Sequence, residues 1–140
     1  RGIIPTLNLK DEKLYFNVNE QVMRRVLQNI IKNVLEHGEK KVEICLDTYG
    51  DEIMLTVQNE VTRPDEIDIE RIFEKFYKAD AARSKTSTGL GMAIAKEMTE
   101  EMGGKIAASL SGNVFKVSIV FMKIRKITGE DSIKDEEILF

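Results

Sequence analysis

An amphipathic helix, predicted for residues 19–37, constrains the fold of this chain more than any other segment. Its apolar residues recur at three- and four-residue intervals, so they form one stripe that must be buried against a second layer. Asn19 is a plausible N-cap for this helix. Asn29, Asn33 and His37 follow one another at one-turn intervals along one edge of the stripe. The stripe consists of Val22, Met23, Val26, Leu27, Ile30, Ile31 and Val34.

The position of Asn29 and Asn33 at the edge of an apolar stripe has two possible explanations. The amide oxygen of an asparagine is a neutral, hard ligand that suits Mg²⁺, which binds proteins through few oxygens and completes its octahedron with water and substrate phosphates. Alternatively, both side chains are half-buried and bonded to neighbouring backbone. The helix alone does not separate a metal site from local hydrogen bonds.

Alternating apolar and polar residues predict strands in the remainder of the chain, and turn residues between them predict hairpins. Residues 67–77 are predicted to form a short helix, and residues 89–102 a second long helix. Runs of strands with helices gathered on one face are typical of a two-layer sandwich. The predicted hairpins join residues 7–10 with 14–18, 42–48 with 53–59, and 105–110 with 114–121.

The predicted fold class is therefore α/β (α+β). We expect a two-layer sandwich with a mixed, largely antiparallel sheet of about five strands, covered on one face by about three helices. Residues 1–122 are expected to form one domain, and residues 123–140 a charged C-terminal tail.

Two glycines, Gly89 and Gly91, open the second long helix, whose apolar residues Leu90, Ile94 and Met98 recur every four positions. The backbone N–H groups and the positive end of this helix face the preceding loop, which is the arrangement of an anion site. A single Gly-x-Gly is a weak signal, because glycines also mark plain turns. The surrounding sequence matches neither the phosphate loop of P-loop NTPases nor a dinucleotide fingerprint.

Composition argues against several classes of protein. The chain has 140 residues, a formal net charge of −3 and no concentrated basic stripe, so nucleic acid is not an expected partner. No apolar run approaches the ~18 residues needed to cross a bilayer, so no direct membrane contact is expected. A single cysteine and a single histidine argue against a disulfide framework or a zinc cluster.

Four motifs, taken together in this order, are far more specific than any one of them. Asn29-Ile30-Ile31-Lys32-Asn33 matches an N box, and Arg71-Ile72-Phe73-Glu74-Lys75-Phe76-Tyr77-Lys78 matches an F box. Thr88-Gly89-Leu90-Gly91 looks like a second glycine box, and Gly103-Gly104-Lys105-Ile106 like the turn and strand that follow its helix. From about residue 2 to residue 122, the chain resembles the catalytic ATP-binding domain of two-component sensor histidine kinases. These belong to the gyrase, chaperone and mismatch-repair ATPase superfamily.

The resemblance implies a Bergerat-type ATP-binding fold that uses ATP and Mg²⁺. Asn33 falls on the family's magnesium ligand. Residues 78–87 correspond to a lid over ATP, from which Arg83 and Lys85 can approach the γ-phosphate; either can also be a plain surface charge. The implied catalytic residues are Asn29, Asn33 and Arg83, and the implied ATP-binding residues are Asn29, Asn33, His37, Asn59, Phe76, Tyr77, Arg83, Lys85, Thr88, Gly89, Leu90 and Gly91.

Two of these assignments keep an alternative. Phe73, Phe76 and Tyr77 recur at helical spacing, so ordinary core packing explains them as well as a role in bracing the lid. His37 closes the N box near the expected nucleotide, with a plain helix-end histidine as the alternative. It is not the phosphoacceptor, because it does not lie in a His-Glu or His-Asp dimerisation helix.

The chain departs from the family pattern at several positions. Asn59 stands where the family has the aspartate that holds the adenine amino group, and an amide oxygen accepts that hydrogen bond without the charge that strengthens it. Ser87 replaces a glycine, and Glu36 occupies a position where many members have a phosphate-binding lysine. The last glycine element is only loosely matched, at residues 112–115. A nucleotide-binding regulatory scaffold, or pseudokinase, therefore stays open as an alternative.

The predicted chemistry is phosphoryl transfer to histidine. Hydrolytic relatives place a glutamate one turn before the magnesium asparagine, but this chain has Asn29 there, and an amide cannot accept a proton. A neutral imidazole is itself a nucleophile near pH 7. The acceptor histidine would come from a dimerisation domain of the same parent protein, and a response regulator would be the next partner. We expect a cytoplasmic domain of a membrane-anchored sensor; an anti-sigma-type serine-protein kinase is a further alternative.

Overall fold

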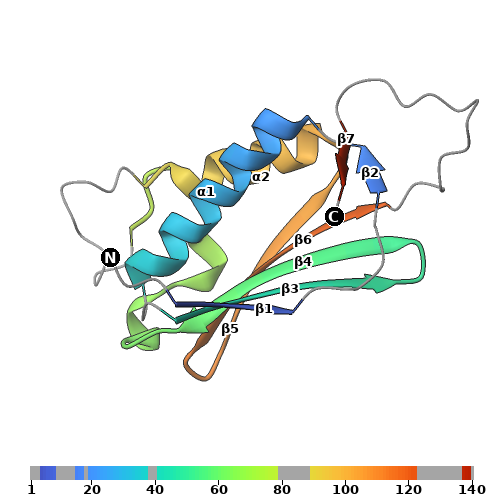
Figure 1. Ribbon diagram of the computed structural model, residues 1–140. Helices are drawn as coiled ribbons and strands as arrows, with labels where there is room; N and C mark the ends of the chain where they lie inside the picture. Colours follow the sequence, from blue (N-terminus) through green and yellow to red (C-terminus); the bar gives the residue numbers. More distant parts are fainter. Residues whose placement is uncertain are drawn as a thin grey trace, which may run out of the picture.

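Two helices lie on one face of a β-sheet in this computed structural model, which describes residues 4–8, 15–17, 19–37, 41–78, 89–122 and 137–139 (Figure 1). The helices are α1 (Glu20–His37) and α2 (Gly91–Glu101), and they pack side by side. This arrangement confirms the predicted two-layer α/β architecture. Neither α-helix of the described part is both long and apolar enough to span a bilayer.

The sheet is mixed and largely antiparallel. Its strand order is β1-β3-β4-β6-β5. Four neighbouring strands pair antiparallel, whereas β1 joins the edge of the sheet parallel to β3. The strands are β1 (Ile4–Asn8), β3 (Lys41–Tyr49), β4 (Glu52–Glu60), β5 (Lys105–Ser111) and β6 (Val114–Met122). The β3–β4 and β5–β6 pairs confirm the two later hairpins predicted from the sequence.

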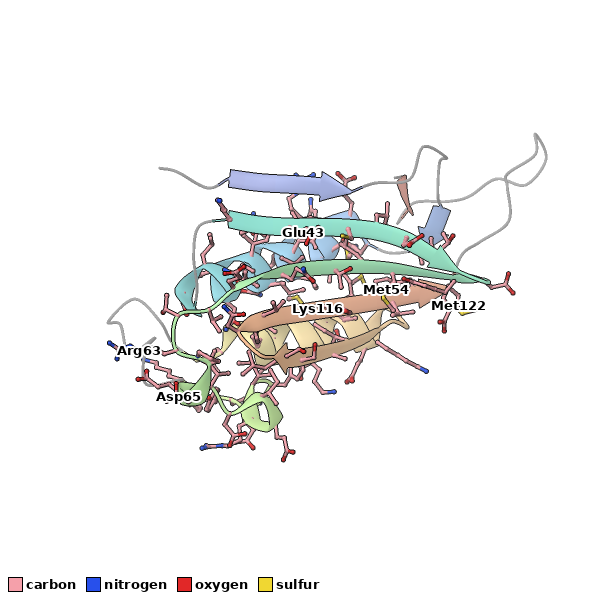
Figure 2. The ribbon with its side chains drawn as sticks, turned by 90° about the horizontal axis from the view of Figure 1, so that it is seen from below. Glu43, Met54, Arg63, Asp65, Lys116 and Met122 are labelled. Carbon is pink, nitrogen blue, oxygen red and sulfur yellow. The ribbon has the colours of Figure 1, made fainter. Side chains whose placement is uncertain are left out.

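The core lies between the helices and the sheet. Strand alternation places every second residue toward α1 and α2, and in β4 these are Ile53, Leu55, Val57 and Asn59, all buried. Within the described ranges, the opposite face of the sheet carries no α-helix, and side chains such as Glu43 and Lys116 lie on it (Figure 2). The fully buried stripe of α1 consists of Met23, Val26, Ile30 and Val34. The amide N–H of Val22 donates to Asn19 Oδ1 over 3.0 Å, which confirms the predicted N-cap.

The prediction of a leading hairpin was wrong. The first segment is β1, which pairs with β3, and the second is β2 (Tyr15–Asn17), which pairs antiparallel with β7 (Glu137–Leu139) near the end of the chain. An isolated two-stranded hairpin is marginally stable, whereas a strand added to an existing sheet edge shares a larger core. β7 falls within the segment that was expected to be a charged tail.

The predicted helix at residues 67–77 was also wrong. The structure has two 3₁₀ turns, η1 (Pro64–Glu66) and η2 (Ile69–Arg71), followed by further turns. Successive i→i+3 hydrogen bonds, from Arg71 N–H to the Asp68 carbonyl and from Glu74 N–H to the Arg71 carbonyl, replace the i→i+4 ladder. The described residues therefore contain two α-helices, not three.

The buried face of α2 also differs from the predicted one. Met92, Ala95 and Thr99 are buried, whereas Leu90, Ile94 and Met98 are only partly buried. The side chains of Ala95 and Thr99 are small, so this face of α2 can lie close to its neighbours. Apolar periodicity alone favoured the larger side chains.

Candidate functional site

The middle of α1 meets the beginning of α2 at Asn29 and Gly91. A β-carbon built at Gly91 would lie 3.4 Å from the Asn29 side-chain oxygen Oδ1. This distance is at the lower limit of ordinary contacts, so glycine leaves room for Asn29 at the first residue of the helix. The structure thus brings together two of the predicted site residues that are 62 positions apart in sequence.

The N-terminus of α2 carries no neutralising side chain of its own helix. Leu90 precedes the helix without capping it through a side chain, and the first turn contains no acidic residue. The first amide N–H groups of any α-helix lack intrahelical acceptors, and the helix dipole adds positive potential there. Both properties favour an anion, such as a phosphate group, at this end of α2.

Asn33 carries an unsatisfied amide oxygen. Its Oδ1 atom is shielded from solvent and accepts no hydrogen bond within the described part of the chain. Most buried oxygens in proteins have a donor, so an orphan of this kind needs an explanation. A hard cation supplies one, because neutral amide oxygens are suitable ligands for Mg²⁺. Local backbone bonding, the alternative considered for this residue, does not account for Oδ1.

Asn59 lies where the end of β4 meets the last turn of α1. Its side chain is only 5% exposed, and its Nδ2–H group donates to the Val34 carbonyl over 3.0 Å. Val34 directly follows Asn33, so Asn59 contacts the part of α1 that carries the candidate metal ligand. Asn59 also lines a cavity of about 310 Å³ at the start of β3, the end of β4 and the start of β6.

Phe76 and Gly89 touch each other. The Phe76 N–H donates to the Gly89 carbonyl over 2.7 Å, and a β-carbon built at Gly89 would lie 2.7 Å from Phe76 Cα. Both residues have positive φ angles, +67° and +74°. Phe76 is 71% exposed, so core packing does not explain it, whereas Phe73 and Tyr77 do pack against the core.

Four other F-box side chains, those of Arg71, Phe73, Glu74 and Tyr77, make contacts within this segment or with α2. The Tyr77 hydroxyl accepts a hydrogen bond from the Asp68 N–H over 2.7 Å, and the Arg71 guanidinium lies 5.2 Å from the centre of the Tyr77 ring. Arg71 also pairs with Glu74 at 3.0 Å, and this hydrogen bond raises the pKa of Arg71. Lys96 of α2 lies 5.7 Å from the centre of the Phe73 ring.

The structure brings Asn29, Asn33, Asn59 and Gly91 to one region bounded by α1, α2 and β4. Arg83, Lys85, Thr88 and the side chain of His37 lie outside the described residues, so the predictions made for them stay predictions. Sequence reasoning missed two contacts, Asn59 with Val34 and Phe76 with Gly89. The inward-facing position of Asn59 in an alternating strand was a signal for the first.

Comparison with known proteins identifies the family. The profile of the family described as "Histidine kinase-, DNA gyrase B-, and HSP90-like ATPase" matches residues 18–124, most of the chain. The chain belongs to this ATPase family. The resemblance deduced from the four motifs is thereby confirmed, and the match includes α1, α2 and every described residue of the candidate site.

Three similar curated proteins are named as sensor histidine kinases or a sensor protein. The chain is 38% identical over 112 residues to the sensor histidine kinase WalK of Bacillus subtilis, a match that covers 75% of this chain and 18% of WalK. It is 33% identical to the sensor histidine kinase YcbM of the same bacterium, covering 76% of this chain and 36% of YcbM. It is 34% identical to the sensor protein VanS of Enterococcus faecium, a match that covers 79% of this chain and 30% of VanS. The chain thus spans about a fifth to a third of these relatives.

Solved structures of family members share the fold. The mycobacterial sensor histidine kinase MprB superposes with a TM-score of 0.71 at 17% identity, over 86% of this chain and 83% of that one. The catalytic domain of the histidine kinase ThkA superposes with a TM-score of 0.69 at 24% identity, over 86% of this chain and 78% of the ThkA chain. These identities are low, so the two likenesses speak for the fold alone.

Proposed function

We propose that this chain binds Mg-ATP in the region bounded by α1, α2 and β4, and that it transfers the γ-phosphoryl group to a histidine of a partner domain. The observation that carries the proposal is the orphan Oδ1 of Asn33, shielded from solvent on the same helix as Asn29, which touches the open N-terminus of α2. An unpaired hard oxygen and an anion-binding helix end are the complementary halves of a magnesium–phosphate site.

Each predicted residue has a role in this proposal. Asn33 would hold Mg²⁺, which supplies charge neutralisation for the phosphates when it is bound. The backbone N–H groups at Gly89 and Gly91 would bind phosphate oxygens, with Thr88 and Leu90 beside them. The amide oxygen of Asn59 would accept a hydrogen bond from the adenine amino group. His37, Phe76, Tyr77 and Lys85 would complete the contacts to ATP.

Transfer to histidine suits this chain better than hydrolysis. The bond from the γ-phosphorus to the bridging oxygen breaks, a bond from the phosphorus to an imidazole nitrogen forms, and ADP leaves. Asn29 cannot accept a proton from water, so nothing at its position activates a water molecule. Arg83 would stabilise the negative charge that develops on the transferred group.

The proposed partners follow from this reaction. The accepting histidine would lie on the dimerisation domain of the parent protein, and a response regulator would receive the phosphoryl group next. We propose a cytoplasmic position for the domain within a membrane-anchored sensor. The relatives named sensor histidine kinases favour this reading over an anti-sigma-type serine kinase or a scaffold.

Calorimetry with ATP, in the presence and absence of Mg²⁺, tests the site. In the Asn33→Ala variant, the gain in ATP affinity given by Mg²⁺ should be at least tenfold smaller than in the wild type. Its thermal unfolding should stay close to that of the wild type, because alanine is the best helix former. Gln28→Ala, on the exposed side of the same helix, is the matched control and should keep the gain. An unchanged Mg-ATP affinity in Asn33→Ala would refute the assignment.

A further inference from the structure

Asn59 is one of two buried polar side chains in the described part of the chain, and it is the one that bonds to α1. It occupies the last inward-facing position of β4, after the buried Val57. Its Nδ2–H group donates to the Val34 carbonyl over 3.0 Å. A strand residue therefore forms a direct bond to the backbone of the helix that carries Asn29 and Asn33.

The Val34 carbonyl is one of the last four of α1, which ends at His37. Carbonyls in the last turn of a helix have no intrahelical N–H partner, so a donor from elsewhere fixes the position of that turn. Val34 directly follows Asn33 in the chain. Holding this carbonyl against β4 therefore also fixes the backbone from which the Asn33 side chain projects.

We propose that Asn59 is a positioning residue: its amide N–H group holds the last turn of α1 so that Asn33 is placed for Mg-ATP. This inference rests on the function proposed above. It assigns the Asn59 side chain a role that a carboxylate cannot perform, because an ionised carboxylate has no hydrogen to donate. An aspartate at this position would face the Val34 carbonyl with a second acceptor, in a site that is 5% exposed.

The bond from Asn59 to the Val34 carbonyl reverses the expected effect of Asn59→Asp on ATP affinity. If Asn59 only read adenine, a carboxylate would strengthen the bond to the adenine amino group. If it holds the last turn of α1, the same substitution releases that turn and weakens Mg-ATP binding. The two roles also differ in their ligands. Adenine reading affects adenosine and ATP alike, whereas positioning of Asn33 affects the gain in ATP affinity given by Mg²⁺.

The test measures ATP affinity by calorimetry, with Mg²⁺ and with EDTA, for the wild type, Asn59→Asp and Asn59→Ala. In both variants, the gain in ATP affinity given by Mg²⁺ should be at least tenfold smaller than in the wild type. The loss should vanish in an Asn33→Ala background, where the positioned ligand is already gone. Gln58→Glu is the matched control: it is also an amide-to-acid change, one residue earlier on the opposite face of β4, where Gln58 bonds to Glu43. It should keep the gain.

Amide hydrogen exchange in the ligand-free protein gives an independent readout. The amides of Leu35 and Glu36 should exchange at least tenfold faster in both Asn59 variants, because the last turn of α1 frays without its tether. Exchange in the first turns of α1 should be unchanged in the same samples, which separates local fraying from a loss of global stability.

Three results would contradict the proposal. A wild-type chain without Mg²⁺-dependent ATP binding would overturn the proposed function and this inference with it. Normal wild-type binding with an unchanged Mg²⁺-dependent gain in Asn59→Asp would overturn this inference alone. An equal loss of affinity for adenosine and for ATP, with the gain preserved, would make Asn59 an adenine contact only.

Discussion

Gly89 is required at its position for two separate reasons. Its φ angle is +74°, a region that costs residues with a β-carbon roughly 1–2 kcal/mol. In addition, a β-carbon there would meet the Phe76 backbone at 2.7 Å, a distance that real contacts do not reach. Phe76 itself has a positive φ, and residues held in this region often lie at ligand sites.

Gly89→Ala should therefore destabilise the protein more than Gly50→Ala. Gly50 lies in the β3–β4 turn with a φ of +63°, and no atom lies within 4 Å of its β-position. Gly50→Ala should therefore lower stability through the backbone conformation alone, without a steric clash. In Gly89→Ala the Phe76 amide should lose its bond to the Gly89 carbonyl and exchange faster, whereas in Gly50→Ala its exchange should be unchanged. Chemical denaturation and amide exchange measure both effects. Equal destabilisation by the two substitutions would show that the Phe76 contact is not rigid.

We propose that Asn29 makes the site a poor catalyst of ATP hydrolysis. Because Asn29 Oδ1 lies beside Gly91 at the N-terminus of α2, a carboxylate at this position would stand next to the proposed phosphates. The wild-type chain should hydrolyse ATP far below ordinary enzyme turnover, ~1–10³ per second, and Asn29→Glu should raise the rate of phosphate release. A phosphate-release assay checks both statements. Ordinary turnover by the wild type would contradict the account of Asn29.

Two adjacent glycines follow α2, and each is needed for a different structural reason. Gly103 has a φ of +86° and open space around its β-position. The Gly104 N–H donates to the Thr99 carbonyl, and a β-carbon on Gly104 would lie 2.5 Å from the Phe121 ring. Gly103 thus reverses the chain after the helix, and Gly104 lets β5 leave it over Phe121 of β6.

Gly103→Ala should cost about 1–2 kcal/mol of unfolding free energy from the backbone alone. Gly104→Ala should cost about 1–3 kcal/mol through overpacking against Phe121, whose side chain is buried. Phe121→Leu should recover part of the Gly104→Ala loss and none of the Gly103→Ala loss. Denaturant unfolding of the single and double variants measures this coupling. Additive losses in Gly104→Ala/Phe121→Leu would mean that the ring does not oppose the β-carbon.

Patterns local in sequence predicted the elements that depend on local forces. The N-cap at Asn19, the buried stripe of α1 and the two later hairpins follow from periodicity and turn residues. The pairing of β1 with β3 and of β2 with β7 depends on partners far along the chain, which no local pattern contains. The F-box segment resembled a helix by spacing, but its buried residues Ile67 and Ile72 are five apart, so one helical face does not bury both.

Motif order nominated residues for the candidate site, but the sequence did not predict the contacts among them. Motif order assigned Asn29, Asn33, Asn59 and Gly91, and the fold brings all four together. The inward-facing position of Asn59 in an alternating strand indicated a buried side chain but not its partner, because backbone carbonyls such as that of Val34 carry no sequence signal. The bond from Asn59 to that carbonyl changes the expected effect of a carboxylate at position 59.

About three quarters of the chain, 75% for WalK and 76% for YcbM, matches one part of these longer relatives. A catalytic module of such a protein should bind ATP without a partner and transfer the phosphoryl group only when an acceptor is present. Arg83→Ala should therefore lower the rate of transfer by at least tenfold while ATP affinity changes little, because charge stabilisation in the transition state does not require ground-state binding. Lys85→Ala, on the same predicted lid, is the comparison. Equal transfer rates in the wild type and Arg83→Ala would assign the role to another cation.

Transfer from γ-labelled ATP to the proposed acceptor, a histidine-bearing dimerisation domain, tests the central claim most directly. With Mg²⁺, the wild-type chain should label that domain with acid-labile, base-stable phosphate, as expected for phosphohistidine, and Asn33→Ala should leave it unlabelled. Little label should appear as free phosphate. Acid-stable phosphoserine, label released mainly to water, or no transfer by a chain that binds Mg-ATP would contradict the account.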